Sequence, residues 1–211
     1  MNSVVRAAYG VMLLCSLLMH SAAQEKLSCK PFAPDVVSIK LLKDYPHHVD
    51  ALCAMWHDVL GKKTYPDFAQ VKEPYTQLLR SQMQDDKLPL ALIALINEEP
   101  IGLCAVRPTC IPRAGAVPWS DEHPEAQPWL AIFVAAAYQK KGVGAKLVTA
   151  AMHYAQQLGF ECVYAVPENK DLEALYIRKG CTKIADTTLR GTPASVLRME
   201  LGELDSGMGL L

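Results

Sequence analysis

The sequence predicts an α/β (α+β) fold, in which a mixed central sheet of about seven strands is flanked by about four helices. The apolar run 129–134, rich in aromatic and β-branched residues, is typical of a strand covered on both faces. It leads through two glycines into an amphipathic helix that starts at Val143, where apolar residues recur three or four positions apart. Two further apolar runs, 90–96 and 101–106, flank the four residues 97–100 and predict a hairpin.

The elements before the hairpin begin with a predicted strand at Val36–Leu42. The segment Pro46–Leu60 places its apolar residues on one face and predicts a helix, with Pro46 in the first turn, where a missing N–H is harmless. A second helix is expected at about 68–84, and Pro74 can split it.

A long connection, Arg107–Pro128, follows the hairpin and contains five prolines. Connections of this length in a compact domain are functional or disordered. A tryptophan among the prolines argues against disorder, and acidic residues follow it closely. The residues that we consider for substrate contact are Trp119, Asp121, Glu122 and His123.

The C-terminal part supplies the remaining elements. We expect a strand at 162–166, a helix at 171–179 that ends at Gly180, and two strands at 182–186 and 195–201. The last two strands are expected to pair antiparallel across the connection Thr187–Pro193.

The turn between the central strand and its helix is a candidate phosphate site. The first N–H groups of a helix have no intrahelical partners and point at one spot, where an anion can bind. Gly142 and Gly144 allow turn geometry and close approach of a ligand, and Lys140 and Lys141 add positive charge. The alternative is that two glycines only shape the turn. The stretch has no third glycine for a dinucleotide fingerprint and no Walker G-K-[ST].

Two stretches resemble the GNAT acetyltransferase superfamily. Gln139, Gly142 and Gly144 match its pyrophosphate loop, which has Gln or Arg, two residues, Gly, one residue, then Gly or Ala. The segment Asn169–Cys181 is similar to the family's N-x-x-A-x-x-x-Y-x-x-x-G-F, with Tyr176 at the family's spacing. Leu172 and Cys181 depart from that pattern. The expected order of strands and helices over residues 36–201 is also that of the GNAT fold.

The resemblance implies an N-acetyltransferase that moves an acetyl group from acetyl-CoA to a primary amine of a small molecule or peptide, by direct attack in a ternary complex and without a metal. In this family the central strand splays from its neighbour at a bulge and exposes a backbone N–H to the thioester; Phe133 and Val134 are the matching positions. Tyr176 would be the general acid, since a phenol is protonated at neutral pH; on spacing alone it could equally be a packing residue. The residues implied in coenzyme binding are Gln139, Lys140, Lys141, Gly142, Val143, Gly144, Ala145 and Asn169.

The general base and the acceptor are left open by the sequence. The glutamate that many relatives carry on the central strand is absent, because residues 130–132 are Leu, Ala and Ile. The acidic, tryptophan-bearing connection favours a cationic acceptor, while Arg107 and Arg113 weaken that argument. The alternative for each candidate base is that it is only a solvated charge on the surface. The candidate bases are His57, Asp58, Asp121, Glu122, His123 and Glu125.

Composition and the chain ends set further limits. A net charge of −1 gives no support to nucleic-acid binding, and a homodimer is compatible with the sequence. Residues 1–23 have a basic start, an apolar core and a small-x-small site, as in a signal peptide or membrane anchor. The alternative is an over-extended start. Export or anchoring conflicts with acetyl-CoA use, which indicates a cytoplasmic catalytic domain. We expect a linker at 24–34, one domain at 35–201 and a loose tail at 202–211.

Cysteines bear on the compartment. Beyond residue 23 there are six, an even number that permits disulfides in an oxidising environment. Cys53, Cys104 and Cys162 fall within apolar patterns, where a cysteine usually acts as a small core residue, so we expect free thiols. Two other functions stay open: a non-catalytic acyl-CoA-binding module, favoured by the missing strand glutamate, and an exported binding protein, which would need disulfides.

Overall fold

The computed structural model describes residues 36–62, 64–110 and 118–202. Seven strands form one sheet in the order β1-β2-β3-β4-β5-β7-β6, so the predicted mixed sheet is confirmed. Only the β4–β5 pair is parallel within this described sheet. The predictions for residues 1–23 and 24–34 lie outside the described residues, and so does the predicted tail 202–211 except for Gly202. The strands are β1 (Ser38–Leu41), β2 (Leu90–Ile96), β3 (Glu99–Arg107), β4 (Trp129–Val134), β5 (Cys162–Ala165), β6 (Thr182–Leu189) and β7 (Thr192–Glu200).

The described residues form five α-helices, one more than we expected. The predicted helix Pro46–Leu60 is a 3₁₀ turn (Pro46–His48), an α-helix and a π-helical turn (His57–Gly61) in succession. Pro74 lies inside α3 without splitting it, although it deprives the helix of one backbone hydrogen bond. The helices are α2 (Val49–Trp56), α3 (Ala69–Ser81), α4 (Pro118–Glu122), α5 (Val143–Gln157) and α6 (Lys170–Arg178).

The β2–β3 hairpin turns more tightly than predicted. Its loop has two residues, Asn97 and Glu98, both with positive φ (50° and 65°), so the predicted four-residue loop was wrong. Two-residue turns with positive φ match the natural twist of paired strands. Pro100 is therefore part of β3, and the register shifts opposite Ala94 and Leu95, a bulge where a residue without N–H is tolerated.

The β6–β7 hairpin differs in the same way. The predicted connection Thr187–Pro193 was wrong, because both strands continue to a two-residue turn at Arg190 and Gly191, with φ of 52° and 74°. The described part of the predicted loop 107–128 also contains structure: Arg107 is the last residue of β3, and α4 packs against β6.

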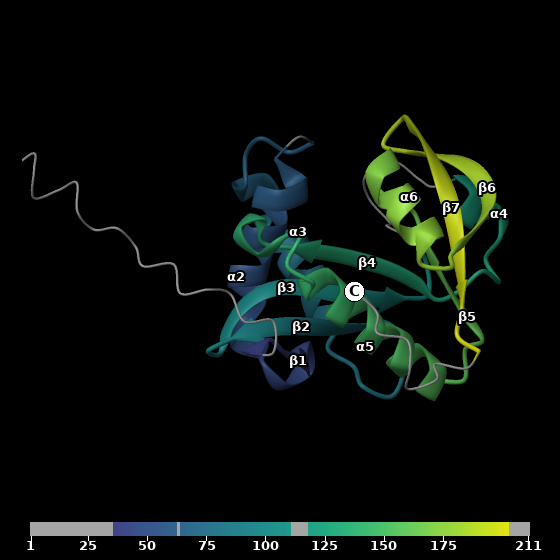
Figure 1. Ribbon diagram of the computed structural model, residues 1–211. Helices are drawn as coiled ribbons and strands as arrows, with labels where there is room; N and C mark the ends of the chain where they lie inside the picture. Colours follow the sequence, from purple (N-terminus) through teal and green to yellow (C-terminus); the bar gives the residue numbers. More distant parts are fainter. Residues whose placement is uncertain (1–35, 63, 111–117, 203–211) are drawn as a thin grey trace, which may run out of the picture. The chain divides into compact units, whose positions relative to one another are not determined.

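Helices cover both faces of the β2–β4 region. Side chains of β4 alternate, and Phe133 joins Leu52 of α2 and Leu79 of α3 in the main core. On the other face, a Cβ at Gly102 would lie 3.2 Å from Leu147 of α5 and 3.0 Å from the Phe133 carbonyl oxygen, so glycine allows α5 to approach. Figure 1 shows α5 crossing in front of β2 and β3.

Cys53, Cys104 and Cys162 are buried and form no disulfide, which confirms the expectation for these three. In the part of the chain that the structure describes, no helix is long and apolar enough to cross a membrane.

Candidate active site

The sheet divides between β4 and β5. These strands pair at one position, Trp129 with Tyr164, where the Tyr164 N–H donates to the Pro128 carbonyl oxygen at 2.8 Å. Figure 1 shows β4 lying across the view while β5 and β7 run steeply, so the strands diverge beyond this contact. The β3–β4 register continues without a shift from Arg107–Trp129 to Gly102–Val134. The split therefore opens on the β5 side of β4, with no bulge toward β3.

The direction of the backbone N–H groups along β4 distinguishes Phe133 from Val134, the two residues expected to contact the thioester. The Ala135 N–H donates to the Ile101 carbonyl oxygen at 2.9 Å, continuing the β3–β4 ladder. Since N–H and C=O groups alternate between the two edges of a strand, the Phe133 N–H also points toward β3. The Val134 N–H points toward the split. Of the two residues, Val134 is the one whose N–H faces the gap between β4 and β5, whereas the described lining of the cavity at this gap includes Phe133 and not Val134.

A cavity of about 580 Å³ opens at this split. Its lining includes Leu130 and Ile132, which share the α5 face, and Ala131 and Phe133, which share the α2–α3 face. The lining also includes Tyr75 of α3 and Val148 of α5, which cover opposite faces of the sheet, so the cavity reaches both faces. Its size is within the range of small-molecule sites.

Tyr176 of α6 lines this cavity beside Cys181. Burial raises the pKa of the Tyr176 phenol to about 12, and the nearby thiols of Cys104 and Cys181 act in the same direction. The phenol is therefore fully protonated at neutral pH, as expected for a proton donor.

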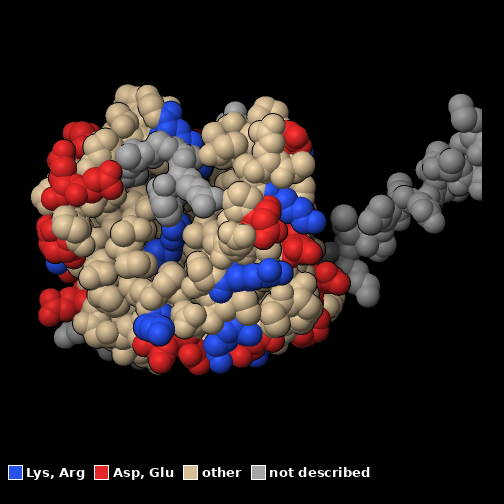
Figure 2. Space-filling model, turned by 180° about the vertical axis from the view of Figure 1, so that it is seen from behind, with Lys and Arg blue, Asp and Glu red and all other residues tan. Residues whose placement is uncertain are grey.

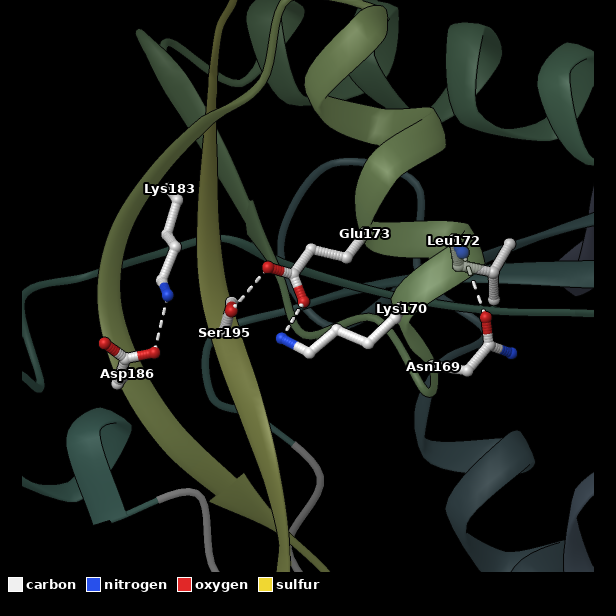
Figure 3. A network of polar contacts seen from close by, with 7 residues as sticks. All are labelled: Asn169, Lys170, Leu172, Glu173, Lys183, Asp186 and Ser195. Atoms are coloured by element: carbon white, nitrogen blue, oxygen red, sulfur yellow. Dashed lines mark hydrogen bonds and ion pairs between the residues drawn. The ribbon is translucent and has the colours of Figure 1, made fainter.

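Polar contacts anchor the start of α6 (Figure 3). The Ser195 hydroxyl of β7 donates to one oxygen of Glu173 at 2.8 Å, and Lys170 Nζ lies 2.7 Å from the other. Asn169 Oδ1 accepts the Leu172 N–H at 2.9 Å and so caps the helix. Asn169 thus has a structural role in addition to the predicted coenzyme contact, for which its NH₂ group can donate.

The glycine turn forms the start of α5 as predicted. Gly142 is the N-cap with φ of 80°, a left-handed conformation that favours glycine. The first hydrogen bond of the helix runs from the Lys146 N–H to the Gly142 carbonyl oxygen at 3.1 Å. The N–H groups of residues 143–145 precede that bond and have no intrahelical acceptor, and no side chain caps this end. These three amides form a cluster of donors suited to an anion.

The rest of the turn is bound to β4. Gln139 Nε2 donates to the Val134 carbonyl oxygen at 2.9 Å, while the Gln139 N–H is directed to Ala136 O at 3.4 Å. The side-chain amide of Gln139 thereby ties the turn to the open edge of β4. A Cβ at Gly144 would meet no atom closer than 3.7 Å, so the described protein leaves space at this position. Lys140 adopts φ of 57°, and Lys141 Nζ lies 5.8 Å from the Tyr138 ring centroid.

The residues considered for substrate contact are not part of the described cavity lining, although the cluster that contains Trp119 shares Leu189 and Val166 with it. Trp119 stacks on His123 at 4.3 Å and packs against Trp129 in a separate apolar cluster. His123 Nδ1 lies 3.1 Å from a Glu125 oxygen. Among described residues, the cavity lining includes neither these side chains nor Asp121 and Glu122.

The other candidate bases are also outside the described lining of the cavity. His57 is buried, with Nε2 2.7 Å from the Tyr65 carbonyl oxygen. Asp58 forms an exposed ion pair with Lys62 at 2.6 Å. Described residues offer no group of three or more His, Cys, Asp or Glu that could hold a metal ion.

Several polar residues of the cavity were not identified as site residues from the sequence, among them Tyr75, Gln82, Arg107, Glu168 and Arg190. Arg107 appeared there only as a charge in the long connection. Its place directly after the apolar run 101–106 is the one signal that could have indicated a strand position.

Comparisons with known structures agree with this geometry. The chain is similar to yncA of Salmonella typhimurium, solved with its cofactor acetyl-CoA (TM-score 0.54, 16% identity, covering 80% of this chain and 95% of that one). It is similar to a ribosomal-protein-alanine N-acetyltransferase from Brucella melitensis, with a TM-score of 0.58 and 16% identity over 77% of this chain and 99% of that one. It is also similar to AAC(6')-Ib in complex with ribostamycin and coenzyme A, with a TM-score of 0.57 and 21% identity over 79% of this chain and 94% of that one. At these identities, the likeness shows the fold.

A comparison with curated proteins finds no match. The model of the acetyltransferase (GNAT) family, however, matches residues 54–181, more than half of the chain, and this span includes the glycine turn, the split strand and Tyr176. The chain therefore belongs to the GNAT family of acetyltransferases, as the two sequence stretches predicted.

Proposed function

We propose that this protein is an acetyl-CoA-dependent N-acetyltransferase that acetylates a primary amine of a small molecule or peptide in a ternary complex. The observation that carries the proposal is the cavity at the β4–β5 split, which contacts both faces of β4 and contains Tyr176. A passage through the sheet lets a donor and an acceptor approach one point from opposite faces.

The start of α5 fits the diphosphate of the donor. The N–H groups of Val143, Gly144 and Ala145 would hold it, since they have no intrahelical acceptors and the helix dipole favours an anion there. The open space at Gly144 accommodates a group close to the backbone. The Asn169 NH₂ group would contact the pantetheine arm. When bound, acetyl-CoA supplies an acyl group activated as a thioester.

Two groups of the chain would stabilise charge as the acetyl group moves. The Val134 N–H faces the split and can donate to the carbonyl oxygen, where negative charge develops. The Tyr176 phenol keeps its proton at neutral pH and can donate it toward the departing sulfur. Both groups belong to anchored elements, because Gln139 holds the Val134 carbonyl and Ser195 holds α6 through Glu173.

For the general base we propose Glu168. It is the carboxylate that lines the cavity among the described residues, and it forms an ion pair with Arg190 at 3.0 Å. A charged carboxylate beside the cavity can accept the proton that the attacking amine must lose.

The proposal is tested by titrating the full chain with CoA in a calorimeter and by measuring release of the CoA thiol from acetyl-CoA with a panel of primary amines. Binding together with amine-dependent release supports an acetyltransferase. Binding without release for every amine would instead identify a non-catalytic acyl-CoA-binding module. Absence of CoA binding would contradict both.

A further inference from the structure

Arg107 is a buried charge within the cavity. It ends β3 opposite Trp129 and is 6% exposed. Because side chains alternate along β3, it shares a face with Leu103 and Ala105, which pack in the core beneath α2 and α3. Arg107 therefore lines the side of the cavity that faces α3.

The guanidinium has no carboxylate partner among the residues that the structure describes. In residues 36–62, 64–110 and 118–202, no carboxylate lies within ion-pair distance of Arg107, and the ionisable groups that act on its charge are Tyr75 and Cys110. Burial accordingly lowers the pKa of Arg107, although the guanidinium stays charged at neutral pH. A buried charge without a partner is strongly unfavourable, so the position makes physical sense when an anion completes it.

A buried amide oxygen without a hydrogen-bond partner among the described residues lines the same cavity. Gln82, just after α3, is 2% exposed, and its Oε1 has no hydrogen-bond partner among the described residues. An amide oxygen accepts hydrogen bonds, so it suits an N–H donor of a ligand. Tyr75 of α3 also lines the cavity and stacks on Trp56 at 4.0 Å, and the charge of Arg107 opposes the burial that raises the Tyr75 pKa.

The charges of the cavity do not balance. Its charged described residues are Arg107, Glu168 and Arg190. Glu168 and Arg190 pair with each other at 3.0 Å, which leaves the positive charge of Arg107 uncompensated. The acidic residues of α4, which favoured a cationic acceptor, do not contribute to this lining.

We propose that the acceptor is a small primary amine that also carries a carboxylate, and that Arg107 binds this carboxylate. The inference rests on the proposed acetyltransferase function. Arginine is the side chain best suited to a planar carboxylate, because its fork of N–H donors can bind both oxygens at once. A cavity of about 580 Å³ that must also hold the acyl end of the donor favours a compact acceptor of the amino-acid kind.

The test uses matched triplets: an amino acid, its carboxamide and the amine that lacks the carboxyl group. With the wild-type chain we expect kcat/KM for the amino acid to exceed that for the carboxamide by about 10- to 100-fold, the worth of a charge-assisted hydrogen bond. A dipeptide amide with an acidic first residue distinguishes a side-chain carboxylate from that of a free amino acid. Equal rates across a triplet would overturn the inference while leaving the acetyltransferase function intact.

Variants and a binding measurement complete the test. Arg107→Met should remove the preference for the carboxylate, Arg107→Lys should retain part of it, and Arg80→Gln, at an exposed arginine of α3, should retain it fully. Should Arg107→Met fail to fold, the Arg107→Lys variant and the wild-type triplets still show whether the carboxylate preference depends on Arg107. Binding of the amino acid can also be measured by calorimetry in the presence of CoA, and this measurement does not depend on turnover. Carboxylate-dependent binding without acetylation would support Arg107 as the site and contradict the proposed function.

In the face seen in Figure 2, basic side chains lie near the middle, and acidic side chains lie beside them as well as along the edges.

Discussion

The Ser195 hydroxyl on β7 donates a hydrogen bond to the Glu173 carboxylate on α6 at 2.8 Å (Figure 3). Ser195 is 1% exposed, so this bond is made where water does not replace it. Tyr176 follows Glu173 by one helical turn, and the bond therefore holds the helix that carries the proposed acid.

Ser195→Ala is expected to destabilise the fold by about 1 kcal/mol, the net worth of one such hydrogen bond. The measurement is urea denaturation of both proteins. Ser81→Ala is the matched control, because the Ser81 hydroxyl bonds the Leu78 carbonyl at an exposed helix end. If the two alanine variants lose the same stability, the contact between α6 and β7 has no special weight.

Acid should weaken the same contact. Lys170, and then the Ser195 hydrogen bond, lower the pKa of Glu173 below its ordinary value. A lowered pKa contributes stability above the unfolded value, about 4.3, and that contribution is lost as pH falls through the folded value. The difference in unfolding free energy between the parent and Glu173→Gln should thus be constant from pH 7 to about 5 and shrink below about 4. A difference that grows toward pH 3 would refute this assignment.

Gly142 and Gly159 separate backbone strain from ligand binding, because both have left-handed φ, 80° and 85°. Alanine at either position should cost about 1–2 kcal/mol of stability. Only Gly142 begins the helix whose amides would hold the diphosphate, so only Gly142→Ala should also weaken CoA binding in calorimetry. Equal CoA affinity in both variants would exclude the start of α5 as the diphosphate site.

The alkaline side of the rate profile reports on Tyr176. Its pKa is raised to about 12, so the phenol keeps its proton well above the ordinary value near 10. The value of kcat should therefore be level from pH 8.5 to 10 and fall only as pH approaches about 12. A decline centred near pH 10 would show that the acid is an ordinary exposed phenol or another group.

Local patterns predicted the regular elements well and the turns poorly. Apolar periodicity located β4 and α5, because burial on one or both faces of an element determines which of its residues are apolar. The hairpin turns were drawn too long because Glu98 and Arg190 adopt positive φ, a conformation their residue types do not signal. Pro100 likewise gave no sign that a bulge would keep it within β3.

Site residues could be predicted from the sequence where they belong to a motif, but not where their position depends on tertiary packing. Gly142 and Tyr176 were singled out by the resemblance to family motifs, and the structure places Gly142 at the start of α5 and Tyr176 in the cavity lining. The orientation of Trp119 depends on its packing against Trp129, and the burial of Arg107 depends on α3, which lies about 30 residues away in the chain. Neither could be read from neighbouring residues.

The most direct test of the central claim is the Tyr176→Phe variant. It should bind CoA as the parent does and acetylate amines about 10²-fold more slowly, because only the proton donor is removed. Tyr154→Phe on α5, whose ring is not part of the described cavity lining, is the matched control and should turn over normally. A Tyr176→Phe enzyme as fast as the parent would contradict acid catalysis by this phenol at the β4–β5 split.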